Sequence, residues 1–437
     1  MRMVSIKKEN AKLREHYYKM RHASGLDIYV FPKKLTSTYA LFATKYGSVD
    51  NCFRPSGASE PTTVPNGIAH YLEHRMFTQK DGSDITERFS EYGADSNAYT
   101  TFTKTVYLFS CTENFDESLG ALVDFVTEPH FTEELVEKER GIIVEEIKMG
   151  EDNPYDRCFY GLLEAMYRNH SVRINIAGTE NSVSEITAGM LNDCYRAFYN
   201  PSNMAIVVCG DVTPEQVMFT VEQHLPYYFV SLETERIYFD EPKEVYQPLY
   251  EAYMPIAKPI FTIGIKDSVP CGAEARMARD AAMQILCEML FSRSGELYNE
   301  LFEDGRISPD LSYGYSITEQ FAFLTVSGES DDPEAVLARI KGYIREKQAE
   351  GIFSADFERC KRVMLAEYIK AFDSTEEIAN NMIDFIFDGG DVFDCYEKLE
   401  AVTLADVEHL LATAFDENFF CISIIRPEGM KKEDINE

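Results

Sequence analysis

The strongest constraint on the fold is a pattern of helices and strands that occurs twice along the chain. Late in the first half, a helix that begins near Thr187 precedes a strand that begins at Met204. The second half repeats this order with a helix from Thr403 and a strand from Phe420, and further matches follow at nearly the same offset. We therefore predict a duplicated α+β domain with about 200 residues in each half. Chance likeness of amphipathic helices would explain any single match.

The chain has 437 residues, which favours two or three domains. We expect a first domain over residues 1–230, a linker over 231–245, and a homologous second domain over 246–437, each with a mainly antiparallel sheet packed with helices. Strands are predicted over 26–32, 39–46, 105–111, 204–212, 260–266, 321–329 and 420–427. Helices are predicted over 68–77, 113–127, 133–149, 187–198, 275–291, 333–350, 354–371 and 404–415.

Charge and composition exclude several classes of protein. Lys and Arg number 42 against 74 Asp and Glu, and the formal charge of −32 argues against a nucleic-acid partner. The same charge permits attraction of basic peptides, or it serves only solubility. No apolar run reaches the ~20 residues of a membrane helix, and no secretory signal begins the sequence, so we expect a cytoplasmic protein. The 10 cysteines form no CxxC pair, which excludes a zinc ribbon and favours reduced thiols.

The sharpest local signal is the sequence H-Y-L-E-H at residues 70–74. Apolar residues at positions 68, 72 and 76 predict a helix with a buried stripe, which Asn66 can cap. His70 and His74 then lie one turn apart on one face, where two imidazoles can chelate one Zn²⁺. Glu73 lies beside them and can act as a general base, as in the inverted zinc-protease motif H-x-x-E-H. The alternative is a pair of surface histidines on an amphipathic helix.

A third ligand is suggested by the helix predicted over 133–149. At about 100° per residue, the apolar residues 135, 142, 143, 147 and 149 define one face. Glu146 and Glu139 lie near the centre of that face, whereas Glu145 lies outside it. A buried carboxylate needs a cation or hydrogen bonds, so we predict Glu146 as a zinc ligand and Glu139 as a residue that orients a ligand or the water. A buried salt bridge to an arginine is the alternative for either residue.

The stretch from Gly93 to Thr101 resembles a strand that enters the sheet beside the metal helix. An exposed strand edge there could bind extended peptide by β-augmentation, with Asn97 contacting the peptide backbone. The alternative is a turn with an ordinary asparagine.

The second half keeps the pattern of helices but lacks these ligands. Gln284, Cys287 and Glu288 stand where the first half has its two histidines and the intervening glutamate. Lys361 and Tyr368 stand at the positions of Glu139 and Glu146. We therefore expect one zinc ion per chain.

With these residues in place, the chain resembles the insulinase (pitrilysin, M16) family of zinc metallopeptidases over nearly its whole length. In length it is similar to the small two-domain bacterial branch, which is related to mitochondrial processing peptidase. The motifs that carry the likeness are Gly67–His74, Ser96–Thr100 and Lys138–Glu146. The resemblance implies a LuxS/MPP-like metallohydrolase fold, in which two such domains face each other across a chamber that admits unfolded peptides.

The resemblance also implies roles for individual residues. Zinc would be held by His70, His74 and Glu146, with Glu73 as the general base and Glu139 as a second catalytic glutamate.

Substrate binding is implied for four further residues. Asn97 and Ala98 match the edge strand of the family, and Phe77 and Tyr99 match positions that line its first primed-side pocket.

One departure concerns an Arg and a Tyr that active family members carry in the second domain. Here Phe302 and Ser308 replace them in the matching run over 300–308, and neither Arg306 nor Tyr313 is in register as a substitute. The chain thus resembles the metal-bearing member of the two-subunit enzymes of the family, whose partner supplies the Arg and Tyr. We expect a zinc endopeptidase that works with such a paralogous subunit. A non-catalytic, zinc-stabilised scaffold or peptide-binding subunit is the alternative.

Overall fold

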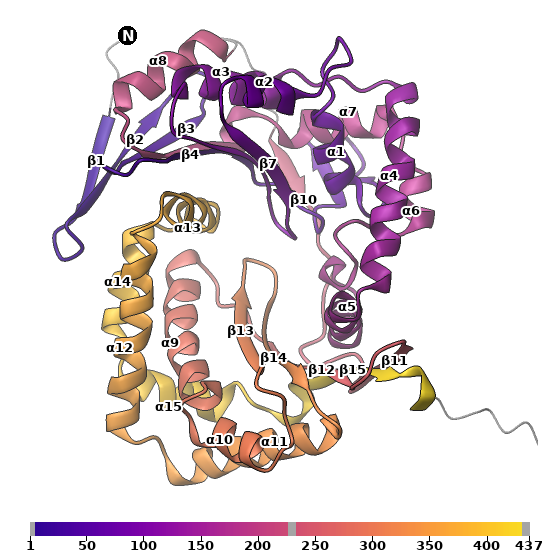
Figure 1. Cartoon of the computed structure of the whole chain (residues 1–437), viewed down its shortest axis with the longest axis vertical. Helices are drawn as coiled ribbons and strands as arrows, with labels where there is room; N and C mark the ends of the chain where they lie inside the picture. Colours follow the sequence, from indigo (N-terminus) through magenta and orange to yellow (C-terminus); the bar gives the residue numbers. More distant parts are fainter. Residues whose placement is uncertain (1–4, 226–232, 431–437) are drawn as a thin grey trace, which may run out of the picture. The chain divides into compact units, whose positions relative to one another are not determined.

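The structure is a computed structural model that describes residues 5–225 and 233–430 (Figure 1). It divides into two compact units, each assembled from separate stretches of sequence. The first takes its described residues from Met1–Ile147, Asn175–Tyr238 and Ile369–Phe387, and the second from Lys148–Ile174, Phe239–Tyr368 and Asp388–Glu437. The first two positions of the expected linker, 231 and 232, lie outside the described residues.

The first unit contains a seven-stranded sheet with the strand order β1-β2-β3-β9-β4-β8-β7. A smaller sheet has the order β10-β5-β6, and β10 lies within the expected linker. All neighbouring strands are antiparallel except β3 and β9. The strands are β1 (Ser5–Asn10), β2 (Glu15–Arg21), β3 (Asp27–Pro32), β4 (Thr38–Thr44), β5 (Cys52–Pro55), β6 (Thr62–Thr63), β7 (Asp95–Thr100), β8 (Thr105–Cys111), β9 (Met204–Gly210) and β10 (Thr234–Arg236).

Helices cover both faces of the large sheet. In Figure 1, α3 and α8 lie on one face and α13 lies on the other, where it packs against β4 and β9. The helices of this unit are α1 (Ile68–Met76), α2 (Ile85–Glu91), α3 (Phe115–Thr127), most of α4 (Glu133–Asp152), α6 (Glu180–Ser184), α7 (Ala188–Phe198), α8 (Pro214–His224) and α13 (Thr375–Phe387).

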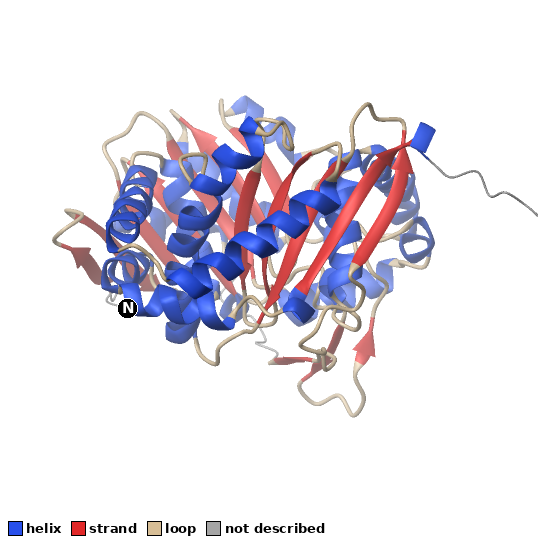
Figure 2. Cartoon of the chain, turned by 90° about the horizontal axis from the view of Figure 1, so that it is seen from below, coloured by secondary structure: helices blue, strands red, loops and turns tan. Residues whose placement is uncertain are grey.

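The second unit is built on a five-stranded sheet with the order β11-β15-β12-β14-β13. Its strands are β11 (Leu249–Met254), β12 (Ile260–Asp267), β13 (Ser312–Ile317), β14 (Ala322–Glu329) and β15 (Phe420–Pro427). Its helices are α5 (Pro154–Met166), α9 (Ala273–Phe291), α10 (Glu296–Glu303), α11 (Pro333–Glu350), most of α12 (Ser354–Ala371), α14 (Val392–Ala401) and α15 (Leu404–Thr413). The strands of both sheets and the helices that flank them can be followed in Figure 2, where they are red and blue.

The two sheets have the same topology, which confirms the duplicated α+β fold. The order β3-β9-β4-β8-β7 in the first unit matches β11-β15-β12-β14-β13 in the second. In each sheet the first pair of this series is parallel and the other pairs are antiparallel. The large sheet of the first unit differs by the additional hairpin formed by β1 and β2.

One helix from each half of the sequence belongs to the unit whose sheet comes mainly from the other half. Helix α5 follows α4 in the sequence but packs against β11, β12 and β15. Helix α13 follows α12, the counterpart of α4, and packs against β4 and β9. The compact units are therefore not contiguous in sequence. The predicted bounds 1–230 and 246–437 describe the two copies of the sequence repeat, and they stay a prediction.

Strong patterns predicted element bounds well. The strands expected over 105–111 and 420–427 and the helices expected over 333–350 and 354–371 have the bounds of β8, β15, α11 and α12. The sequence pattern did not predict the β1–β2 hairpin or helices α5, α8, α13 and α14. No helix within residues 5–225 and 233–430 is long and apolar enough to cross a membrane.

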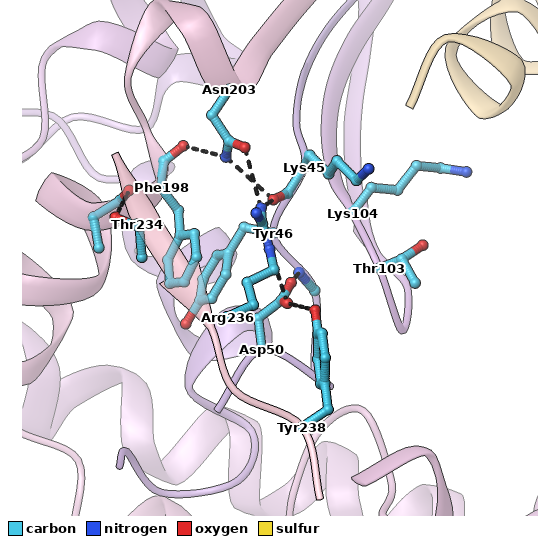
Figure 3. A network of polar contacts seen from close by, with 12 residues as sticks. Lys45, Tyr46, Asp50, Thr103, Lys104, Phe198, Asn203, Thr234, Arg236 and Tyr238 are labelled. Carbon is cyan, nitrogen blue, oxygen red and sulfur yellow. Dashed lines mark hydrogen bonds and ion pairs between the residues drawn. The ribbon is translucent and has the colours of Figure 1, made fainter. Parts of the chain in front are cut away.

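A buried ion pair fixes the loop that supports the β7–β8 turn. Arg236 of β10 donates from Nε to the Asp50 carboxylate at 3.1 Å, and the Tyr238 hydroxyl donates to the same oxygen at 2.7 Å (Figure 3). Burial raises the pKa of Asp50, and the adjacent Arg236 opposes this. The other Asp50 oxygen accepts the Gly47 N–H, and a side chain at Gly47 would collide with the Phe102 backbone at 2.4 Å.

This pair yields a prediction for stability. Arg236→Met leaves the Asp50 carboxylate buried without its cation, so the free energy of unfolding should fall by about 3–5 kcal/mol. Urea unfolding monitored by circular dichroism measures the change. The matched control is Glu235→Gln on the same strand, which breaks an exposed pair with Arg54 and should cost less than about 1 kcal/mol. Equal losses for the two variants would contradict the assignment.

Candidate metal centre

Helix α1 carries the H-x-x-E-H sequence and is held by a glycine at its start. Ile68, Leu72 and Met76 are buried, as the four-residue spacing predicted. Gly67 is the N-cap with φ of 89°, and a Cβ there would lie 2.4 Å from the Ala177 carbonyl oxygen, so only glycine fits.

The expected cap by Asn66 is wrong. No side chain caps α1, and the Asn66 side-chain oxygen instead accepts a hydrogen bond from Asn51 Nδ2 at 2.8 Å. This bond holds the loop before the helix to residue 51. The prediction failed because an asparagine two residues before the first helical residue can form a hydrogen bond elsewhere as easily as to the helix.

Helices α1 and α4 bring three potential metal ligands together. His70 Nε2 lies 3.5 Å from Glu146 Oε1, and His74 Nε2 lies 3.3 Å from Glu146 Oε2. One donor atom from each of the three residues lies within 4.8 Å of the others. Tetrahedral zinc with bonds of about 2.0–2.1 Å separates neighbouring donors by about 3.3 Å, so the donor set fits this ion. Within residues 5–225 and 233–430, no other group of His, Cys, Asp and Glu has this geometry.

The face of α4 that the sequence analysis expected to be buried is partly wrong. Ile143 and Ile147 are buried, but Ile142 is 56% and Met149 is 74% exposed. The buried face is therefore rotated away from these two residues, and the Glu146 side chain at its margin remains 48% exposed. Glu146 meets the histidines from the edge of the core, not from its centre.

The two carboxylate oxygens of Glu139 contact a histidine and an arginine of α1. Its Oε1 is 3.1 Å from His74 Nδ1, and its Oε2 accepts a hydrogen bond from Arg75 Nη1 at 3.2 Å. The interaction with Nδ1 leaves His74 Nε2 directed at Glu146. Glu139 thus contacts both a predicted ligand and an arginine, and its role in orienting that ligand stays a prediction.

The remaining carboxylate of the motif is buried beside the ligands. Glu73 is 6% exposed, and its Oε2 accepts a hydrogen bond of 2.6 Å from the Thr100 hydroxyl of β7. Burial raises the pKa of Glu73, although the neighbouring His70 and the Thr100 hydrogen bond oppose this. A carboxyl group with a raised pKa exchanges a proton more readily near neutral pH.

The three predicted ligands form a cluster of interacting charges. Burial lowers the pKa of His74, but the hydrogen bonds to Glu139 and Glu146 outweigh it and raise that pKa to about 9. Hydrogen bonds from His70 and His74 hold the pKa of Glu146 well below its usual range. This arrangement already favours a positive charge between the imidazoles and the carboxylate.

Three of the residues expected to bind substrate lie on the edge strand β7, and the fourth, Phe77, lies at the C-terminal end of α1. Asn97 is exposed, and its side-chain oxygen accepts the N–H of Ala98 at 2.9 Å. The Tyr99 hydroxyl is engaged by Asn380 of α13 at 2.7 Å. Phe77 packs its ring edge-on against Phe125, with 4.9 Å between ring centres.

The corresponding helices of the second unit use their residues for structure. Glu288 of α9 is buried and accepts a hydrogen bond from the Tyr313 hydroxyl. Lys361 donates to the carbonyl oxygens of residues 400 and 402, and the Tyr368 hydroxyl donates to the carbonyl of Val392. These contacts hold the region of α14.

The positions discussed for an Arg and a Tyr are also occupied differently. Phe302 is exposed and stacks on Tyr298, and the Ser308 hydroxyl contacts Lys258 at 3.2 Å. Arg306 forms an exposed ion pair with Asp304, at 3.3 Å.

Two residues of this candidate centre, Arg75 and Thr100, were not predicted from the sequence. Arg75 is 1% exposed, and a charged residue beside the buried stripe of a helix was the available signal, because such a group needs a partner. Thr100 lay inside the Ser96–Thr100 motif, but its contact with Glu73 depends on how β7 packs beside α1, which no local pattern shows.

Comparison with known proteins identifies the family. Residues 55–180 match the family model described as insulinase (peptidase family M16), and residues 185–364 match the model described as peptidase M16 inactive domain. The chain is 39% identical to YmfH of Bacillus subtilis, named as an uncharacterized zinc protease, over 92% of this chain and 95% of that protein. The chain therefore belongs to the M16 peptidase family.

Solved structures and a further relative agree with this assignment. An M16-like peptidase from Alicyclobacillus acidocaldarius has a TM-score of 0.90 and 31% identity, with 98% of this chain and 99% of that chain covered. A protease from Helicobacter pylori shares the fold with a TM-score of 0.80 at 18% identity, over 94% of this chain and 100% of that one. The zinc protease PqqE of Helicobacter pylori is 23% identical over 76% of each chain.

The geometry predicts which variants lose metal. His70→Ala, His74→Ala and Glu146→Gln each remove a donor, so each should lower the zinc content of the purified chain from about one equivalent to near zero. Atomic emission spectroscopy after dialysis measures this content. Glu145→Gln, the same chemical change one residue earlier on α4, should keep zinc. Loss of zinc in Glu145→Gln but not in Glu146→Gln would overturn the ligand set.

Proposed function

We propose that the chain is a zinc-dependent endopeptidase that hydrolyses peptides or unfolded segments. One zinc ion per chain would be held by His70, His74 and Glu146, with Glu73 as general base and Glu139 orienting His74. The observation that carries the proposal is the buried carboxylate of Glu73 next to a three-residue donor set. Membership of the M16 peptidase family, with named zinc proteases among the relatives, supports it.

The residues divide the chemistry of peptide-bond hydrolysis between them. Zinc, when bound, supplies a Lewis acid that polarises the scissile carbonyl and acidifies water. The Thr100 hydroxyl occupies Oε2 of Glu73, so Oε1 is the oxygen that takes the proton from the attacking water. The same carboxyl group then returns that proton to the leaving amine. The raised pKa of Glu73 lowers the cost of holding the proton between these two steps.

The substrate would extend the large sheet at β7. This strand ends the order of the seven-stranded sheet, so one of its edges has no strand partner within the described residues. The Ala98 N–H donates to the Asn97 side chain, which occupies the position that a peptide carbonyl takes in β-augmentation. A bound peptide would replace this contact and free the Asn97 amide to bond the peptide backbone.

The second candidate is a zinc-stabilised scaffold or peptide-binding subunit. Structural zinc sites are closed by four protein ligands, whereas catalytic sites have three and an open position. The donor group found among the described residues has three members. The Thr100 hydroxyl holds the Glu73 carboxylate beside the proposed ligands. A general base at that position is needed for hydrolysis but has no role in a structural zinc site, which favours the peptidase.

We also propose a paralogous partner subunit. Phe302 and Ser308 stand where active relatives carry an Arg and a Tyr, and their side chains are an exposed ring and a hydroxyl engaged with Lys258. The hydroxyl of Tyr313 is donated to the buried Glu288, so this tyrosine is committed within its own unit. A partner that presents an Arg and a Tyr would supply the missing contacts to substrate.

Replacing the base tests the peptidase. Glu73→Gln removes the proton acceptor without removing a proposed zinc ligand, so the zinc content should persist. The rate of peptide hydrolysis should fall by about 10²–10⁴-fold, the usual contribution of a general base. Cleavage of fluorogenic peptides and metal analysis of the same preparation measure both. Glu145→Gln should cleave like the wild type. Unchanged turnover by Glu73→Gln would reject the mechanism and favour the scaffold.

Adding the partner tests the assembly. The isolated chain should bind zinc but cleave peptides slowly, and an equimolar paralogue that carries the Arg and Tyr should raise the rate by about 10²–10³, the usual effect of one preorganised donor. Peptidase assays of the chain alone and of the mixture compare the two. A paralogue with both residues changed to Ala is the control. Full activity of the isolated chain, with no gain on mixing, would refute the heterodimer.

A further inference from the structure

The edge strand β7 is held differently on its two faces. Side chains alternate along a strand, so Ala98 and Thr100 share one face and Asn97 and Tyr99 the other. The first face contacts α1 through Thr100 and Glu73. The second face contacts α13 through Tyr99, although α13 lies more than 270 residues later in the sequence. Both helices belong to the first unit.

Helix α13 reaches the strand through one asparagine. The Tyr99 hydroxyl donates to Asn380 Oδ1 at 2.7 Å, and Asn380 Nδ2 donates to the Tyr39 hydroxyl of β4 at 3.3 Å. Burial raises the pKa of both tyrosines, so both hydroxyls keep their protons. Asn380 therefore joins the edge strand to a central strand of the same sheet.

One helical turn further on, α13 contacts the turn that follows β7. Asp384 pairs with Lys104, whose side chain is 13% exposed. Residues 380 and 384 lie on the same face of the helix because they are four positions apart. The strand and its turn are thus both attached to one rigid element that itself packs on β4 and β9.

An edge strand has hydrogen-bonded neighbours on one side only, so other contacts must fix its position. A peptide added to a strand that is not fixed must also order that strand, and this cost weakens binding. The α13 contacts reduce this cost, because they hold Tyr99 near the C-terminal end of β7 and Lys104 in the turn that follows it.

We propose that Asn380 and Asp384 are positioning residues for peptide binding: they fix β7 so that a peptide added to its edge lies beside Glu73. This inference rests on the proposed peptidase function. It makes the substrate-binding strand dependent on residues from the second half of the sequence. It also assigns the Tyr99 hydroxyl to strand position rather than to direct contact with substrate.

The test compares three variants of the full chain in the peptidase assay, in whichever assembly is active. Asn380→Leu should raise KM about three- to tenfold and leave kcat within about twofold, because hydrogen bonds to the strand form in ground state and transition state alike. Asn380→Asp should restore most of the affinity, since a carboxylate can accept from both tyrosine hydroxyls. Asn381→Leu is the matched control on the same helix and should behave like the wild type.

A purely structural role would lower the melting temperature of Asn380→Leu without changing KM, and this result would overturn the proposal. Tyr99→Phe provides a second test if Asn380→Leu fails to fold. It removes one hydroxyl and should raise KM by a similar factor. An unchanged KM in Tyr99→Phe would reject the role of the Asn380 contact.

A binding measurement separates this proposal from the proposed function. Glu73→Gln binds without cleaving, so a labelled peptide that the wild type cleaves gives Kd directly by fluorescence anisotropy. Addition of Asn380→Leu to Glu73→Gln should weaken Kd three- to tenfold, the same factor as for KM. If the wild type cleaves no peptide, the peptidase function fails. If it cleaves and Kd does not change, only the positioning role fails.

Discussion

The packing of α1 against α4 governs the candidate metal centre, because it gathers three carboxylates and one guanidinium around two imidazoles. Glu73, Glu139 and Glu146 contribute three negative charges, and Arg75 contributes one positive charge. With neutral imidazoles, the form that binds a metal ion, the cluster carries a net charge of −2 at the edge of the core, and a bound cation would offset it. A divalent ion balances it. Arg75 is thus part of the reason that a site with three glutamates suits Zn²⁺.

The second unit shows what the same scaffold does without that charge. Its sheet repeats the strand order and pairing of the first, and α9 and α12 correspond to α1 and α4. At the equivalent positions a lysine and a tyrosine donate hydrogen bonds to backbone carbonyls near α14, and Glu288 pairs with Tyr313. The second unit therefore uses these positions to contact α14 and β13, whereas the first unit uses them to join α1 to α4.

The sequence predicted which residues come together at the candidate metal site, but only part of their surroundings. His70, Glu73 and His74 follow from helical spacing, which local sequence determines. Glu146 was predicted from a buried face whose limits were wrong, since Ile142 and Met149 are exposed. The prediction still identified the residue that meets the histidines, because a glutamate at the margin of a core face reaches the same neighbours. The partners Arg75, Thr100 and Asn380 depend on tertiary packing, which the periodicity of a single element does not describe.

The exchange of helices explains why domain bounds were harder to predict than elements. An amphipathic pattern shows that a helix such as α13 buries one face, but not which sheet receives it. Helix α13 covers β4 and β9, and α5 covers β11, β12 and β15. Each sheet is therefore covered in part by a helix from the other half of the sequence. Neither half alone supplies all the helices that bury the apolar face of its sheet. Stable folding of the unit that carries the metal ligands then requires contacts between residues near 40, 205 and 380, which form only when distant parts of the chain meet.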